Sequence, residues 1–206
     1  HYGKLHTDAN DTAGFPVLAI GLTNYATDVG LDIPPDMYRD VNKLEKKLNM
    51  LGHDPATWRY TTLSLSLESL QHYIAPESRM VIFEKDGSVA SSPAATAGTL
   101  LHIDDKRADS VTYLSAAMDA QGDGGYPFVS PFTTFEAIWA MCPLWLSGAL
   151  APDNSEVKRL LDYIWSKWQH GRGISFSDTF HVPDLDDSAV AYLFLDWGGY
   201  DVNSSF

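Results

Sequence analysis

The fold class is decided by the stretch SEVKRLLDYIWSKWQHG, residues 155–171. Its apolar residues are Val157, Leu160, Leu161, Ile164, Trp165 and Trp168. This spacing places them on one side of an α-helix. Asn154 or Ser155 can cap the start of the helix, and Gly171 can end it. We therefore predict a helix from Ser155 to His170 with one buried face.

The rest of the chain also favours helices. They are expected from Pro35 to the stop at Gly52, and over 61–74, 108–118, 134–150 and 188–197. The interval 61–74 also permits a strand, because its first leucines alternate with period two, but Leu67, Leu70 and Ile74 continue at helical spacing and favour a helix. The small residues of 90–98 predict a loop. With no sustained strand alternation, the expected fold class is all-α.

Composition restricts the function further. The chain has 206 residues, of which 45% are hydrophobic, so it is globular rather than disordered or fibrous. It carries 27 acidic against 14 basic residues, a formal net charge of -13. Such a charge repels phosphate backbones and disfavours general binding to nucleic acid.

Cysteine content and hydropathy bear on location. The single cysteine, Cys142, excludes an internal disulfide, so we expect a reducing, cytoplasmic location. No apolar run reaches the roughly 18 residues of a membrane span. The chain starts at His1, without a signal-peptide core, and we expect it to be a piece of a longer protein.

Three carboxylates within four residues, Asp184, Asp186 and Asp187, stand before an apolar helix. One interpretation is helix capping, since acidic side chains favour the N-terminal dipole. The other is acid catalysis. Mutual repulsion and burial both raise carboxyl pKa values and produce a proton donor at neutral pH.

Aromatic residues are dense around this cluster. They are Phe176, Phe180, His181, Tyr192, Phe194 and Trp197, with Trp139, Trp145, Trp165 and Trp168 on preceding helices. Each alone is typical of a core. Gathered in one cavity, their faces attract cations, which suits a reaction that carries positive charge through an apolar skeleton.

Several ordered blocks resemble the class II diterpene cyclases, the copalyl diphosphate synthase family. Residues 184–189 (DLDDSA) resemble the family's DxDD signature. Residues 86–97 (DGSVASSPAATA) are similar to its DGS…SPSATA segment, and 126–139 (YPFVSPFTTFEAIW) to its P-x-x-x-P-x-x-x-FE-x-IW stretch. The tail 197–202 (WGGYDV) is similar to the turn after the signature. The resemblance covers at least residues 86–206, and its third block most resembles the fungal, bifunctional type.

The resemblance implies an all-α, α/α-barrel architecture with an active site between two domains, called γ and β. Residues 1–125 would be the γ-like domain, and 126–206 the N-terminal part of the β-like domain. The division falls at the Gly- and Pro-rich stretch 122–127. The family implies further β-domain helices and, in some fungal members, a prenyltransferase α domain. The 206 residues alone would then be inactive. A homo-oligomer is a further possibility.

The resemblance also implies an isomerase. Geranylgeranyl diphosphate is protonated at its terminal alkene and closes two rings to copalyl diphosphate, with the diphosphate retained. By position, Asp186 is the general acid, and Asp184 and Asp187 tune its protonation. We expect substrate contacts from Trp139, Phe128 and Tyr192.

Three positions depart from the plant ent-type pattern. Leu65 and Phe128 stand where a histidine and an asparagine hold the water that takes the final proton, so the base is unassigned. The resemblance implies Mg²⁺ as cofactor. The acidic ligand position falls near Pro16, which cannot ligate a metal through its side chain, and the metal ligands are therefore unassigned.

Three alternatives remain. Farnesyl diphosphate, the C15 substrate, would use the same acid in a shorter pocket of a drimane-type cyclase. A non-catalytic helical interaction module would need the aspartates only as caps. An α/α-barrel glycosidase would use paired carboxylates to protonate a glycosidic oxygen.

Overall fold

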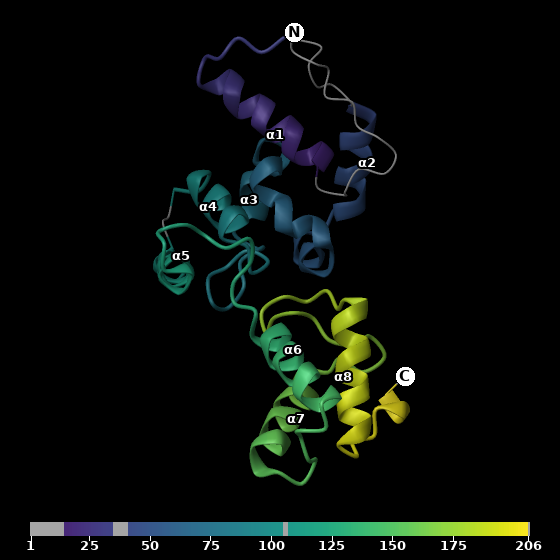
Figure 1. Cartoon of the computed structure of the whole chain (residues 1–206). Helices are drawn as coiled ribbons and strands as arrows, with labels where there is room; N and C mark the ends of the chain where they lie inside the picture. Colours follow the sequence, from purple (N-terminus) through teal and green to yellow (C-terminus); the bar gives the residue numbers. More distant parts are fainter. Residues whose placement is uncertain (1–14, 35–40, 105–106, 206) are drawn as a thin grey trace. The chain divides into compact units, whose positions relative to one another are not determined.

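The computed structural model of the chain describes residues 15–34, 41–104 and 107–205, and within these ranges it is helical without a named strand (Figure 1). The all-α prediction is confirmed. In chain order the elements are α1 (Phe15–Asp28), α2 (Val41–Leu51), η1 (Pro55–Tyr60), η2 (Thr62–Tyr73), α3 (Pro76–Arg79), α4 (Pro93–Leu101), α5 (Ala108–Gln121), α6 (Thr133–Leu146), α7 (Ser155–Lys167), α8 (Leu185–Trp197) and η3 (Asn203–Ser205), where η marks 3₁₀ helix.

The chain divides into two compact units, one ending at Val129 and the other beginning at Ser130. Each unit has its own hydrophobic cluster. The sequence-based domains, 1–125 and 126–206, and their γ-like and β-like names stay predictions. The helix start predicted near Pro35 lies outside the described residues.

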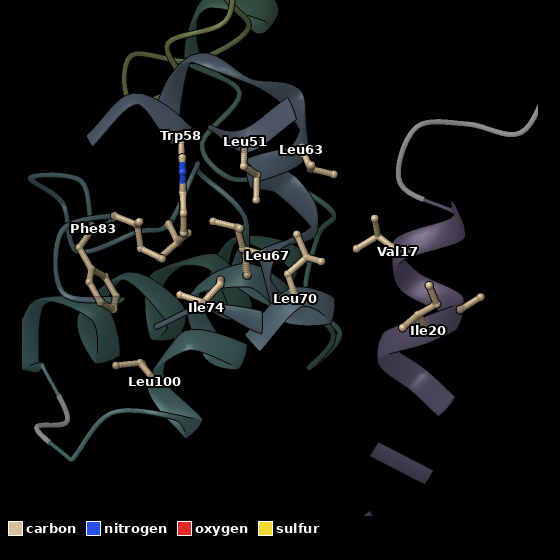
Figure 2. Packing of buried hydrophobic residues seen from close by; sticks show 14 residues of the cluster. Val17, Ile20, Leu51, Trp58, Leu63, Leu67, Leu70, Ile74, Phe83 and Leu100 are labelled. Atoms are coloured by element: carbon tan, nitrogen blue, oxygen red, sulfur yellow. The ribbon is translucent and has the colours of Figure 1, made fainter. Parts of the chain in front are cut away.

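The first unit is built around η2. Leu67 and Leu70 are 1% and 0% exposed, and they lie in the middle of the cluster drawn in Figure 2. Val17 and Ile20 of α1 point toward these leucines (Figure 2), and α4 also packs against η2. The central element of this unit is thus a 3₁₀ helix covered by two α-helices.

The 3₁₀ geometry of η2 explains its ambiguous sequence pattern. Three residues per turn place Leu67 and Leu70 on the same face. The Thr61 hydroxyl caps the start by accepting the Leu63 N–H at 3.3 Å, and Ser66 interrupts the helix with φ −118°. The segment is therefore helical, as favoured, but tighter and kinked rather than a continuous α-helix.

The loop predicted for residues 90–98 is wrong from Pro93 onward, where α4 begins. Pro93 stands in the first turn, where its missing N–H costs nothing, and Ser92 caps the helix by accepting the Ala95 N–H at 3.2 Å. Thr96 donates to the Ser92 carbonyl at 2.7 Å. Small residues predict a loop by composition. In α4 they instead allow a helix to pack closely against its neighbours and to be largely buried.

The second unit packs α6, α7 and α8 against one another (Figure 1). The helix predicted from Ser155 is confirmed as α7, with Asn154 accepting the N–H groups of Glu156 and Val157. It ends at Lys167, before the expected His170. The most buried side chains of this cluster come from all three helices: Ile138, Leu161, Ile164, Phe194 and Leu195.

In the described part of the chain, none of the helices is both long and apolar enough to cross a bilayer.

The turn at Asp86-Gly87-Ser88 docks against the start of α5. Asp86 Oδ1 accepts both the N–H and the hydroxyl of Ser88, at 3.0 and 2.7 Å. Ser110 of α5 donates its hydroxyl to the Gly87 carbonyl at 2.6 Å. Gly87 has φ +83°, and a Cβ there would lie 2.5 Å from the backbone of Asp109 and Ser110. Backbone conformation and close approach both require glycine.

We expect Gly87→Ala to lower the free energy of unfolding by at least about 2 kcal/mol, because strain at positive φ and a clash with helix backbone add. Gly122→Ala is the matched control. It has φ +76° but nothing within 4 Å of its Cβ, so it should cost only about 1 kcal/mol. Urea denaturation followed by circular dichroism measures both, and equal losses would contradict the role given to the close approach.

Candidate active site

Asp184 caps the N-terminus of α8. Its Oδ1 accepts the backbone N–H of Asp187 at 3.0 Å, and its own backbone is extended, with φ −111° and ψ 165°. The helix starts at Leu185, three residues before the predicted Ser188. Two of the three carboxylates, Asp186 and Asp187, therefore belong to the first helical turn.

The first turn of α8 is tied to the preceding loop. The Asp184 N–H donates to the Ile174 carbonyl at 3.2 Å, and Ser188 Oγ accepts the Ile174 N–H at 3.0 Å. Gly173, at φ +103°, makes this approach possible, since a Cβ there would lie 2.2 Å from Ser188 Oγ. These contacts set the position of the carboxylates.

Asp187 points into the interior of the second unit. It is 1% exposed, and its Oδ1 accepts the indole N–H of Trp139 from α6 at 2.6 Å. Its other oxygen, Oδ2, is buried and has no hydrogen-bond partner among the described residues. Capping therefore accounts for Asp184 but not for Asp187.

Asp186 differs from its two neighbours because its side chain is exposed. Leu185 beside it is 87% exposed. A carboxylate in the first turn of a helix is stabilised by the helix dipole. The sequence grouped the three aspartates together, whereas the structure separates one exposed group from two shielded ones.

Burial is the main cause of the pKa shifts of Asp184 and Asp187. It raises the pKa of Asp184 to about 6, with further rises from the charges of Asp187 and Asp186. Burial also raises the pKa of Asp187, against the lowering effect of its hydrogen bond from Trp139. Like charges close together disfavour ionisation of both groups. Asp184 and Asp187 therefore keep their protons to higher pH than ordinary aspartates do.

A cavity of about 650 Å³ lies beside the first turns of α8. Asp184 and Tyr192 both line it. The other lining residues are Trp168, Arg172, Gly173, Pro183, Leu185, Ser188, Ala189 and Leu193. The lining is mostly apolar, with Arg172 and Asp184 as its charged members.

The three aromatic residues predicted to contact substrate have different positions. Tyr192 lines the cavity, and its hydroxyl donates to Asn203 Oδ1 at 2.7 Å. Trp139 contacts Asp187 and is not among the lining residues. Phe128 belongs to the other unit and is 75% exposed. All three roles stay predictions.

Gly173 and Ser188 shape the site, although neither was predicted as a site residue from the sequence. A signal existed for Ser188. It follows Asp184 by four residues, the spacing that brings side chains of one helix face together. Gly173 carried no comparable signal, because its role depends on a contact with a helix further along the chain.

A Mg²⁺ site would need several oxygen ligands close together. Within residues 15–34, 41–104 and 107–205, no group of three or more His, Cys, Asp or Glu side chains is arranged to hold a metal ion. Pro16 stands in the first turn of α1. These residues do not provide a preformed Mg²⁺ site, and the cofactor stays a prediction.

Asp184→Asn should change the pH dependence of stability. Asparagine preserves the cap but cannot ionise. The raised pKa of Asp184 means that wild-type stability is greatest when the carboxyl is protonated, and that it is lost as the pH rises from about 4 through about 6. The variant should therefore gain roughly 1–2 kcal/mol relative to wild type over that range, after allowance for partial exposure.

Urea denaturation at several pH values, followed by tryptophan fluorescence, measures this difference. Five of the six tryptophans lie in residues 130–206, so the signal reports mainly on the second unit. A difference between variant and wild type that stays constant with pH would contradict the assignment.

Comparison with curated proteins found related plant enzymes. The chain is 33% identical over 207 residues to the bifunctional levopimaradiene synthase, chloroplastic, of Pinus banksiana, covering 98% of this chain and 24% of the relative. It is 32% identical to the bifunctional abietadiene synthase, chloroplastic, of Abies grandis, covering 98% and 23%. No family model matches the chain.

Solved structures give the same result. Abietadiene synthase from Abies grandis superposes with a TM-score of 0.68 at 31% identity, over 93% of this chain and 25% of that one. Ent-copalyl diphosphate synthase from Arabidopsis thaliana, in complex with (S)-15-aza-14,15-dihydrogeranylgeranyl thiolodiphosphate, has a TM-score of 0.68 at 28% identity, over 97% and 29%.

These relatives bear on the earlier expectations. Those named above come from plants, so they give no support to the fungal type, and the two synthases matched by sequence are named as chloroplastic, which does not support the predicted cytoplasmic location. The chain spans about a quarter of the length of the curated relatives it matches. With nearly its whole length aligned in sequence and superposed in structure, the chain belongs to the class II diterpene cyclase family.

Proposed function

We propose that the chain carries the acid motif of a class II cyclase that converts geranylgeranyl diphosphate to copalyl diphosphate. The observation that supports this most directly is the carboxyl cluster at the start of α8, in which Asp187 is buried and the partly buried Asp184 lines a largely apolar cavity. Alkenes are very weak bases, so their protonation needs an acid that keeps its proton near neutral pH.

In the proposed reaction, the Asp186 carboxyl gives its proton to the terminal alkene. A new C–H bond forms, and the cation left on the neighbouring carbon is attacked in turn by the next two alkenes, which closes two C–C bonds. A base then removes one proton to form a new alkene. Atoms balance as an isomerisation, the diphosphate stays attached, and the Asp186 carboxylate regains its proton from solvent.

The role of Asp186 is carried over from its position in the motif. Its exposed side chain is free of the interior contact that holds Asp187, which suits a group that must meet a substrate. The aromatic side chain of Tyr192 in the cavity wall would favour the cationic intermediates.

The proposal includes the γ-like and β-like names for the two units. It also includes further helical segments, beyond those described, that would enclose the acid and exclude water. Magnesium stays part of the proposal as a family property, and no step above depends on it.

The assay uses the 206-residue chain and, in parallel, a longer protein that contains it. Each is incubated with geranylgeranyl diphosphate or with farnesyl diphosphate, with and without Mg²⁺. The products are dephosphorylated and identified by mass spectrometry. A bicyclic C20 alcohol supports the proposal, a cyclic product from the C15 substrate alone supports the drimane-type alternative, and only acyclic alcohols would overturn both.

Asp186→Asn should abolish cyclisation, with a loss of at least about 100-fold, because an amide cannot supply the proton. Since the side chain is exposed, the free energy of unfolding should change by less than about 0.5 kcal/mol. Asp196→Asn, an exposed position near the other end of α8, is the matched control and should keep wild-type activity. Equal loss of stability and activity in Asp186→Asn would instead favour the non-catalytic module.

A further inference from the structure

The contact between Trp139 and Asp187 joins two helices in the interior of the second unit. The indole N–H of Trp139 in α6 donates to Asp187 Oδ1 in α8 at 2.6 Å, across 48 positions of sequence. Asp187 is 1% exposed. A hydrogen bond from a single neutral donor satisfies only part of what an ionised carboxylate accepts.

The second oxygen of Asp187 makes the contact unusual. Oδ2 is buried and unpartnered within the described structure. An ionised carboxylate in this position would leave charge on a buried oxygen without a donor among the described residues, which is costly. A neutral carboxyl removes this cost when Oδ1 remains the acceptor from Trp139 and the proton resides on Oδ2.

The charge of Asp186 favours the same state, because it raises the pKa of Asp187. A side-chain hydrogen bond with Asp184 acts in the opposite direction and lowers that pKa. From α6 Asp187 faces the neutral indole of Trp139. Arg172, a cation, lines the cavity together with Asp184, and Asp187 is not among the lining residues. Burial raises the pKa of Asp187 further.

Asp187 is also linked to the cavity. Its backbone N–H donates to Asp184 Oδ1 at 3.0 Å, and Asp184 lines the cavity wall. A side chain that fixes Asp187 therefore also fixes the first turn of α8, on which all three carboxyl groups stand. Trp139 is the residue of α6 in the position to do this.

We propose that Trp139 is a positioning residue, whose indole N–H fixes Oδ1 of Asp187 and thereby orients the carboxyl cluster, while the burial of Oδ2 keeps this carboxyl neutral. This deepens the proposed function and rests on it for its catalytic consequence. It replaces the sequence-based expectation that Trp139 contacts substrate through its ring. The ring itself packs near Phe135, with centroids 5.9 Å apart.

The direct test is an NMR titration of the ¹⁵N-labelled chain, which does not depend on activity. Each of the six tryptophans contributes one indole N–H signal, and Trp139→Phe identifies that of Trp139 by its disappearance. The signal should move with pH, with a midpoint above the ordinary aspartate value of 3.8. In Asp187→Asn, which keeps an acceptor oxygen but no ionisable group, this movement should vanish.

Two results would overturn the proposal. One is a midpoint for the Trp139 indole signal at or below the ordinary aspartate value of 3.8, because Asp187 would then be ionised at neutral pH. The other is a movement that persists in Asp187→Asn, since it would then report another group. If Trp139→Phe fails to fold, the wild type and Asp187→Asn still decide the question. The indole signal that moves with pH in the wild type and no longer moves in Asp187→Asn is the one that reports on Asp187.

The catalytic consequence is tested separately in the active protein. Trp139→Phe keeps an aromatic ring and removes the donor, so kcat should fall by about tenfold or more, with KM little changed and the pH profile shifted. Trp145→Phe is the matched control in α6, where the ring contacts Phe194 and Trp197, and it should leave the pH profile unchanged.

The kinetic outcomes separate positioning from substrate contact. A Trp139→Phe variant with raised KM, unchanged kcat and an unchanged pH profile would contradict the proposal and favour ring contact with substrate. If the wild-type protein cyclises neither diphosphate, the proposed function fails, while the NMR titration still decides whether Trp139 holds a neutral Asp187.

Discussion

The removal of carboxyl groups from water at the start of α8 is the constraint on which the site depends. Ionised carboxylates are costly to bury, and this cost is met here in two ways. Asp184 uses its oxygen to cap the helix, and Asp187 accepts a hydrogen bond from Trp139. Neither contact neutralises the charge, so the remaining cost shifts both groups toward their protonated forms.

Contacts with the preceding loop and with α6 hold the first turn of α8 in place. Gly173 lets the preceding loop approach Ser188, whose hydroxyl accepts the Ile174 N–H, while Trp139 holds the opposite side from α6. The contacts come from a loop and two helices. The orientation of the carboxyl groups therefore depends on contacts from several parts of the second unit, and not on the acidic motif alone.

The three aspartates differ in how far helix capping accounts for them. Asp184 is a cap and also lines the cavity, Asp187 is buried away from any capping role, and Asp186 is exposed. A helix start needs one such cap, so the two other carboxyls require a different explanation. The proposed function would supply one, because protonation of an alkene calls for an acid in surroundings that disfavour its ionised form.

The sequence by itself determined the helical class, the extent of α7 to within a turn, and the place of the acidic cluster at a helix start, because these follow from spacing and capping between near neighbours. It did not reveal the 3₁₀ form of η2. It also did not reveal the helix α4, although the Ser92 cap and Pro93 in the first turn are local signals of a helix start. Only the tertiary structure decided which aspartates are shielded and that Trp139 bonds one of them. Burial is set by residues distant in the chain, and no local pattern records a contact between positions 139 and 187.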